Sequence, residues 1–497
     1  MQESGAGVAA VLQPTQPARR NGTVLVYVTT FLLLSWPLLV NGAPFYSDDS
    51  TSYLRGGRFG FNTGLLMVHQ WWQSLVPTSL HSSAGGNANT IVANAIAQSG
   101  GTRSLIYSVV TYLLRAPGVS LLALALAQVG AVAFVVCSLR QLIVPQSGIR
   151  SSIASSAAVA FLTSAAWYAA YAIPDILAGV AIAGATALTI FHDRTSLPQR
   201  LALVLLVAFC ITAHGTHLLV TLSVLVVGGI ANFLTCREAP GARLRAAIWF
   251  ASPMVIAVTA LLGTSYLAFG EWSLAPKRYP IQLARSVADG PGAWYLREHC
   301  ATEHYAICEI FGPSPPRQVH EFLWAKDGVR YRATPQQMER IRAEETTIVR
   351  RAALEYPAAQ TRRSATNMAS QLLRFGVSGL PFNVEMTDGD DPGLVSSGPD
   401  RPQLKTIADR LIYCTFFASI LLLAAFRKKL TRSEIAATSA VVIGLLVNAA
   451  VCGILSGVTD RYQGRSAWVL PTLAFMILLR IWRQSRLPAT NANVVLA

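Results

Sequence analysis

Charged residues are scarce in this sequence. Only 13% of its 497 residues are Asp, Glu, Lys or Arg, whereas soluble globular proteins carry roughly 25%. This scarcity argues against a soluble enzyme of two or three domains. Disorder and fibrous repeats are excluded as well, because 52% of the residues are hydrophobic and neither Gly nor Pro is enriched. A polytopic membrane protein remains.

Acidic residues are the scarcer kind of charge, with 25 Asp and Glu against 40 Lys and Arg. The net charge of +15 would suit a protein that binds nucleic acid. In a membrane protein, however, cytoplasmic loops collect Lys and Arg, so the basic residues have to be placed before they are interpreted. We expect no nucleic-acid partner.

Long apolar runs, by contrast, are abundant. Since a helix needs about 20 apolar residues to cross a bilayer, the sequence predicts an all-α integral membrane protein with about ten transmembrane helices. Pro37 inside the first run predicts a kink there. The predicted helices cover residues 24–42, 118–139, 152–173, 175–191, 200–213, 216–234, 246–269, 406–426, 433–456 and 467–482.

The basic residues orient these helices. If the N-terminus is cytoplasmic, every short inner loop carries Lys or Arg, whereas the outer turns near residues 174 and 214 carry none. An even number of crossings then places both termini in the cytoplasm, and we expect a multi-pass protein of a bacterial inner membrane. The inner basic residues are Arg19, Arg20, Arg140, Arg150, Arg194, Arg200, Arg237, Arg243, Arg245, Arg427, Lys428, Lys429, Arg432, Arg480, Arg483 and Arg486.

Two segments between the predicted helices are long enough to fold outside the membrane. The first outer loop contains two amphipathic runs, Leu65–Val76 and Ser104–Leu114, which are typical of helices lying on the membrane surface. The sequence therefore predicts a disordered cytoplasmic tail (1–18), a seven-helix membrane module (19–270) with its long first outer loop (43–117), a mostly helical extracytoplasmic domain (271–404), a three-helix membrane module (405–486) and a cytoplasmic tail (487–497).

Cysteines are few, and five of the seven lie in or beside predicted helices. The other two, Cys300 and Cys308, lie close together in the extracytoplasmic segment. An oxidising compartment allows them to form a disulfide, which is the preferred interpretation. The alternative is a pair of free thiols.

The strongest candidate for chemistry follows the first predicted helix. Asp48 and Asp49 emerge at the membrane surface, and Arg55 and Arg58 follow one to two helical turns later. A carboxylate here could act as a general base on a hydroxyl group, and the arginines could bind a phosphate. The alternative is an N-cap, with Ser47 or Asp48 starting a helix.

Three further candidates lie near the same membrane surface. Arg103 opens the second amphipathic run and could face a lipid phosphate or snorkel to the interface, and Tyr107 lies in the same stretch. Asp175 follows Pro174 between the third and fourth predicted helices. An N-cap of the fourth helix is the preferred interpretation of Asp175.

Two pairs of residues at helical spacing complete the candidates. His214 and His217 lie in the tight turn between the fifth and sixth predicted helices, where they could bind phosphate, relay protons, ligate a metal or simply be solvated. Arg461 and Arg465 are four residues apart, so they share one face if that segment is helical. They could bind a phosphate or serve as interfacial anchors beside Trp468.

All these candidates gather near the outer membrane surface, while the apolar runs hold almost no charge. A transporter usually keeps ionisable groups near the membrane midplane. The pattern therefore favours an enzyme that acts on a lipid-anchored phosphate at the outer surface.

The plan of the chain resembles the GT-C superfamily of polytopic membrane glycosyltransferases. Those proteins begin with a helix from the cytoplasm and a long first outer loop with membrane-parallel helices, and an acidic residue early in that loop is their catalytic base. Asp48 and Asp49, in Phe45-Tyr46-Ser47-Asp48-Asp49, stand at the matching position. The seven-helix module of the superfamily corresponds in plan to residues 19–270.

The resemblance implies a sugar donor linked to a polyprenyl phosphate and an acceptor that is a glycan, a lipid or a protein. Asp48 or Asp49 would deprotonate the acceptor, which would attack with inversion. Arg103, Arg461 and Arg465, with His214 and His217, would stabilise the leaving phosphate. The two aspartates permit a divalent cation (Mg or Mn) without demanding one. The alternatives are a transporter or flippase of a lipid-linked saccharide and a non-catalytic scaffold in envelope assembly.

Overall fold

A computed structural model describes residues 17–75, 103–115, 120–145, 147–235, 240–380, 385–388, 391–395 and 401–486. The predicted tail 487–497 and nearly all of the predicted tail 1–18 lie outside these residues. The regular secondary structure of the described part is helical except for one antiparallel strand pair, β1 (Glu385–Asp388) and β2 (Asp391–Val395), and an isolated bridge between Phe45 and Tyr171.

Within the described residues, seven helical segments are long and apolar enough to cross a membrane. They confirm the predicted helical class and are candidate membrane spans by their length and composition. The segments comprise the pair α1 (Pro17–Leu34) and α2 (Trp36–Asn41), α6 (Leu122–Ile143), α11 (Gly215–Thr235), α12 (Pro240–Phe269), α20 (Pro402–Ala425), α21 (Arg432–Leu455), and α22 (Asp460–Ala467) with α23 (Val469–Arg486). The other three predicted spans correspond to shorter apolar helices, α7 (Ile149–Leu162), α9 (Leu177–Ile190) and α10 (Leu197–Ala213).

Two of the predicted spans contain breaks. The first breaks at Ser35, between α1 and α2, and Pro37 lies in the first turn of α2, so the predicted kink is confirmed. The third was predicted as one helix over 152–173, but α7 ends at Leu162 and a short helix, α8 (Ala165–Ala169), follows. The Thr163 hydroxyl donates to the carbonyl of Val159 at 2.6 Å and accepts from the amide of Ala165 at 3.2 Å. These local bonds compete with continuation of the helix.

Helix α9 lies at the centre of the bundle, and all its residues from Leu177 to Thr189 are buried. It packs against α6, α10, α11 and α21. Small side chains make this close packing possible, because apolar helices in a membrane associate by shape. A Cβ atom on Gly179 would lie only 2.3 Å from Nε1 of Trp468.

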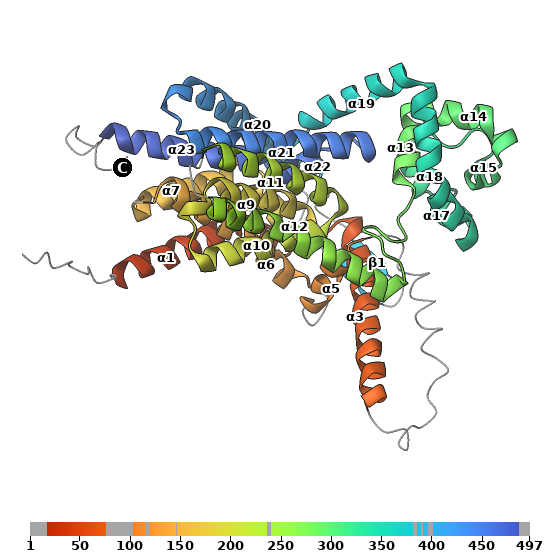
Figure 1. The fold of residues 1–497 in the computed structure, drawn as a ribbon, viewed down its shortest axis with the longest axis horizontal. Coiled ribbons are helices and arrows are strands. Elements are labelled where there is room, and N and C mark those ends of the chain that lie inside the picture. The colour runs from red at the N-terminus through yellow and green to blue at the C-terminus, as the bar shows by residue number, and fades with distance from the viewer. Residues whose placement is uncertain are drawn as a thin grey trace, which may run out of the picture.

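The two ends of the bundle differ. The start of α1 and the end of α23 lie at one end, whereas α3 (Asp48–Leu75) and α5 (Leu105–Leu113) lie at the other, with α3 crossing the direction of the long helices (Figure 1). Residues from separate helices also meet near the first end. Arg480 pairs with Glu434 and donates to the carbonyl of Lys429 at 2.8 Å. The short 3-10 helices are η2 (Pro174–Ile176), η3 (His192–Arg194) and η4 (Arg427–Lys429).

A second hydrophobic core lies beyond the end that carries α3, and its buried residues run from Leu283 to Ala352 (Figure 1). We call the helices around it the α13–α18 unit. It consists of α13 (Ile281–Asp289), α14 (Pro291–Glu303), α15 (Ala306–Phe311), α16 (Val319–Leu323), α17 (Val329–Arg332) and α18 (Pro335–Glu355). Helix α19 (Pro357–Leu372) leads back to the bundle, where buried Gln371 exchanges hydrogen bonds with Thr459.

The predicted disulfide between Cys300 and Cys308 is present in the α13–α18 unit. Replacing both cysteines by serine should lower the stability of this unit by about 2–3 kcal/mol, because the bond restricts the unfolded chain. Thermal unfolding of the full-length protein would measure the loss. A thiol-reactive mass tag should reach these two cysteines only after reduction, and labelling without reductant would contradict the disulfide.

Candidate active site at one end of the bundle

The first turn of α3 places Asp49 at the end of the bundle. Ser47 starts the helix, since the backbone N–H of Asp49 donates to its hydroxyl at 3.3 Å, and the N–H of Ser47 donates to Ser50 Oγ at 3.1 Å. The predicted N-cap is therefore Ser47. Asp48 is the first residue of α3, and its side chain lies outside the described residues. Because the Ser47 side chain caps the helix, the Asp49 carboxylate is available for other partners.

Asp49 is held by two arginines that come from distant parts of the chain. Arg103, just before α5, pairs with its Oδ1, and Arg461, in α22, donates to its Oδ2 at 2.5 Å. Each carboxylate oxygen thus receives one guanidinium group. Arg103 and Arg461 were predicted as separate phosphate-binding candidates, and the structure brings both to Asp49, one of the two residues predicted as the base.

Asp175 forms a second, fully buried ion-pair site. Arg461 Nε and Arg465 Nη1 donate to its two oxygens, the latter at 2.9 Å. The predicted role as an N-cap was wrong. The residues that precede η2 and α9 are Ile173 and Ile176, and neither makes a side-chain cap. A buried carboxylate needs a positive partner far more than a helix needs a cap.

Arg465 is the most enclosed member of the cluster, with no exposed surface. Besides Asp175, its guanidinium donates to Thr216 Oγ1 at 2.8 Å and to Asn448 Oδ1 at 3.1 Å. Arg461 and Arg465 lie in the same helix, α22, and reach the same carboxylate, which confirms that they share one helical face.

These contacts form one continuous series, which we call the ion-pair chain: Arg103, Asp49, Arg461, Asp175 and Arg465. It holds three positive and two negative groups, so one positive charge is left over. It also joins the first outer loop to the turn before α9 and to the C-terminal helices. An anion that approaches the ion-pair chain therefore meets a surplus of one positive charge from these five groups.

A cavity of about 240 Å³ lies beside the ion-pair chain. Arg103, His214 and Lys277 are its basic lining residues, and Ser108 contributes a buried hydroxyl without a partner among the described residues. The rest of the wall is mainly apolar, from Phe59, Leu105, Ile211, Leu218, Leu261, Phe269 and Leu274. Cationic groups beside hydrocarbon surface suit an amphiphile with an anionic head group.

The two histidines have different environments. His214 lines the cavity, and its Nδ1 lies 2.9 Å from Thr216 Oγ1. His217 is fully buried, its Nδ1 donates to the carbonyl of Cys210 at 2.8 Å, and its Nε2 has no hydrogen-bond partner among the described residues. Their ring centroids are 5.3 Å apart. Only His214 can therefore contact a molecule in the cavity.

The electrostatics of the site keep Asp49 ionised and His214 neutral. Burial alone would raise the pKa of the Asp49 carboxyl, but Arg461 and Arg103 outweigh it and hold the pKa below its ordinary value. Burial, followed by the charge of Arg465, lowers the pKa of His214 to about 3. At neutral pH His214 thus offers a hydrogen bond rather than a charge.

The low pKa of His214 makes stability depend on pH. Below the ordinary histidine pKa of about 6.5, the unfolded chain takes up a proton at His214 that the folded protein does not, so the free energy of unfolding falls as the pH drops toward 3. We expect the melting temperature of His214→Gln to fall less between pH 7 and pH 5 than that of the unchanged protein. The control is His320→Gln, at an exposed position, and equal slopes for all three proteins would contradict the prediction.

Three other predicted residues lie outside this cluster. Tyr107 is buried, and its hydroxyl donates to Gln128 Oε1 at 3.0 Å, so it braces α5 against α6. Arg55 and Arg58 lie farther along α3 and are not among the described residues that line the cavity.

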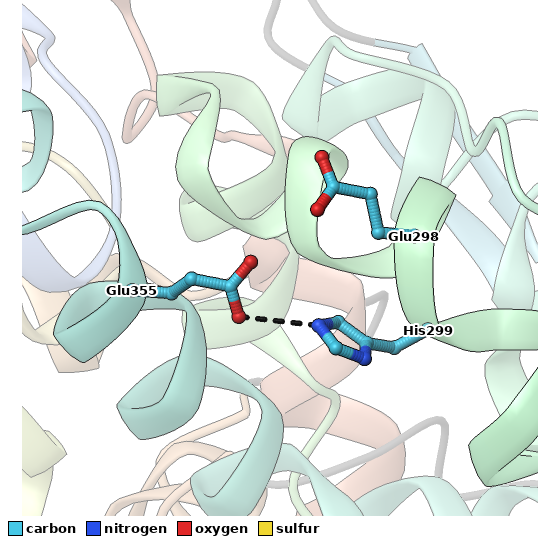
Figure 2. A group of neighbouring side chains, drawn as sticks. All are labelled: Glu298, His299 and Glu355. Atoms are coloured by element: carbon cyan, nitrogen blue, oxygen red, sulfur yellow. Dashed lines mark hydrogen bonds and ion pairs between the residues drawn. The ribbon is translucent and has the colours of Figure 1, made fainter.

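The described residues at Asp49 do not fit a divalent cation, because both carboxylate oxygens already receive guanidinium groups. Ligand types suitable for a metal come together elsewhere, at Glu298, His299 and Glu355 on α14 and α18. Figure 2 shows His299 facing Glu355, with Nε2 and Oε2 3.1 Å apart. Tyr356 donates to Glu298 at 3.0 Å, so ordinary surface hydrogen bonding also accounts for this group.

Lys277 lines the cavity, although no pattern in the sequence pointed to it. It follows α12 in a segment that was assigned to the extracytoplasmic domain, and only the return of this segment over the bundle brings it to Arg103 and His214. Thr216 and Asn448, two neutral partners of Arg465, were missed for the same reason.

No protein-family model matches the chain, and a search of curated proteins finds no match.

Proposed function

We propose that the protein is a membrane glycosyltransferase that moves a sugar from a polyprenyl-phosphate-linked donor to an acceptor hydroxyl at the extracytoplasmic face. The observation that carries this proposal is the placement of Asp49 and its arginines beside a largely apolar cavity that shares Arg103. A carboxylate, a surplus positive charge and a hydrocarbon-lined space are what proton abstraction next to a lipid phosphate requires.

The proposal includes a topology of ten crossings with both termini in the cytoplasm of a bacterium. The start of α1 and the end of α23 lie at one end of the bundle, and the candidate site lies at the other (Figure 1). The basic loops that the positive-inside rule assigns to the cytoplasm include the Arg427–Lys429 turn, which contacts Arg480 near the end of α23. The site would then face away from the cytoplasm.

The size of the cavity suits a head group rather than a whole lipid. Its volume of about 240 Å³ is below the roughly 300–1,000 Å³ of typical ligand pockets. In this proposal Arg103 and His214 contact the donor phosphate, and the first part of the hydrocarbon chain follows the apolar wall toward α12. The remainder of the polyprenyl chain stays in the surrounding lipid.

The proposed step is one displacement. The acceptor oxygen attacks the anomeric carbon while the bond from that carbon to the phosphate oxygen breaks, so the configuration inverts. Asp49 takes the hydroxyl proton, and the polyprenyl phosphate leaves with the bonding electrons, stabilised by Arg103. A second, buried aspartate, Asp175, keeps Arg461 in position throughout.

Asp49 is a weak base while both arginines hold it. A donor phosphate in the cavity competes with Asp49 for Arg103, because both are anions within reach of one guanidinium. When Arg103 turns from Asp49 to the phosphate, Asp49 loses one of the positive charges that lower its pKa. In this proposal, donor binding therefore makes Asp49 more basic just before it is needed.

Proteoliposomes that contain the protein, a polyprenyl-phosphate sugar and candidate acceptors test the proposal. A glycosyltransferase releases polyprenyl phosphate and forms a glycosidic bond of inverted configuration. A flippase moves the donor across the bilayer without forming a bond, and a scaffold does neither. Donor movement without bond formation would exclude the proposed enzyme.

A further inference from the structure

The segment between α12 and α13 forms part of the cavity wall. We call residues 270–280 the strap. Leu274, Ala275, Pro276 and Lys277 from the strap line the cavity together with Arg103 and His214. The strap is thus placed where it can contact whatever occupies the cavity, and its only basic lining residue among those described is Lys277.

Lys277 has a strained backbone. Its φ angle is 53°, in the left-handed region that residues with a Cβ atom rarely adopt. A glycine would take this conformation without strain. Strain of this kind persists where the surroundings impose it and is concentrated at ligand-binding sites.

Helix α18 imposes this conformation. Arg342 donates through Nη2 to the carbonyl of Lys277 at 2.9 Å and through Nε to the carbonyl of Arg278 at 2.8 Å. Arg278 in turn pairs with the buried carboxylate of Glu345 at 3.0 Å. Two residues of one helix therefore hold the strap at the strained residue and at the residue that follows it.

The ammonium group of Lys277 has partners that a ligand can replace. It contacts Glu271 at 2.6 Å and Glu339 at 3.0 Å, and these side chains are 43% and 55% exposed. Ion pairs with such exposed carboxylates contribute little. A phosphate inside the cavity would offer Lys277 an anion that is shielded from water.

We propose that Lys277 is a second phosphate-binding residue of the cavity, acting with Arg103, and that Glu339 on α18 competes with the ligand for it. This inference rests on the proposed function, since it assumes a lipid phosphate as the occupant. It assigns the α13–α18 unit a role at the site: Arg342 holds Lys277 in place, and Glu339 sets how readily it is released to the ligand.

Binding of farnesyl phosphate to the full-length protein in nanodiscs tests the inference, with farnesol as the uncharged probe. We expect Lys277→Gln to weaken farnesyl phosphate binding about tenfold, as for one lost charge-assisted hydrogen bond, and to leave farnesol binding unchanged. Lys277→Arg should retain most of the affinity. Lys326→Gln, at an exposed position of the same unit, is the matched control and should have no effect.

Two further variants separate binding from folding. Lys277→Gly relieves the backbone strain, so it should fold at least as well as the unchanged protein and still lose about tenfold in farnesyl phosphate affinity. Glu339→Gln removes one of the two carboxylates that compete with the ligand for Lys277 and should tighten binding about two- to threefold, an effect that a merely structural lysine would not produce.

The outcomes distinguish this inference from the proposed function. If Arg103→Gln loses farnesyl phosphate binding but the Lys277 variants do not, the role of Lys277 is wrong and the anion site stands. If the unchanged protein binds farnesyl phosphate no better than farnesol, the anion site itself is wrong, and the proposed function fails with it. Normal affinity in Lys277→Gly alone would suffice to reject the inference.

Discussion

Replacing Asp49 by asparagine should reduce sugar transfer by about a hundredfold to ten-thousandfold, which is the usual contribution of a general base. Asparagine keeps the shape of the side chain but cannot take the acceptor proton. Binding of the lipid phosphate should persist or become tighter, because the amide no longer competes for Arg103 and Arg461. Transfer rates in proteoliposomes and farnesyl phosphate affinity in nanodiscs measure the two effects separately.

The neighbouring residue provides the sharpest control. Asp48→Asn changes the same charge one position earlier in α3 and should leave transfer nearly unchanged if Asp49 is the base. A reversed order of effects would assign the base to Asp48. Full activity in both single variants and in the double variant would reject a carboxylate base at this position. Asp327→Asn, at an exposed site of the α13–α18 unit, controls for the loss of one negative charge.

The second large effect concerns Arg465. Replacing it by methionine leaves Asp175 with a single partner in a fully buried site. Removing one member of a buried ion pair typically costs about 3–5 kcal/mol, and because Arg461 still pairs with Asp175 the lower end of this range applies here. We expect a loss of this size in the free energy of unfolding, measured by denaturation in mixed micelles. Arg363→Met, on the exposed side of α19, should change it by less than about 0.5 kcal/mol.

A double variant shows whether the cost arises from this pair. Asp175→Asn together with Arg465→Met removes both charges, so it should be less destabilising than the sum of the two single changes. Strict additivity would mean that the two residues act independently, which would contradict the contact between them. In the double variant Arg461 faces the new amide at position 175 in place of a carboxylate. Part of the loss in the free energy of unfolding should therefore remain.

The helical class and most of the long helices could be predicted, because the length of an apolar run and the requirement for backbone hydrogen bonds in a bilayer are local properties. The break at Thr163 could not, since averaging over a window conceals one hydroxyl that bonds to its own backbone. The site was likewise only partly predictable from local patterns. Asp49 could be recognised as a charged residue beside an apolar run, but its contacts with Arg103 and Arg461 could not be predicted.

Asp175 illustrates why the partners were missed. From the sequence it is an acid beside a proline before a helix, which fits a cap. Its partners lie 286 and 290 residues later, and nothing in the local pattern refers to them. The spacing of Arg461 and Arg465 did predict their shared face, because four residues make about one helical turn. Their pairing with Asp175 depends on how distant helices pack, so the local sequence does not predict it.

The order of synthesis gives the ion-pair chain a further consequence. In a growing chain Asp175 is made 286 residues before Arg461, so for most of translation the nascent bundle would carry a carboxylate without its arginines. A nascent or truncated protein that ends before α22 should keep this region open to water and to the membrane's quality-control proteases. Arrival of α22 would then close it. The helices that precede α22 should therefore reach their folded arrangement only after α22 has been made, and they should not fold as a separate unit.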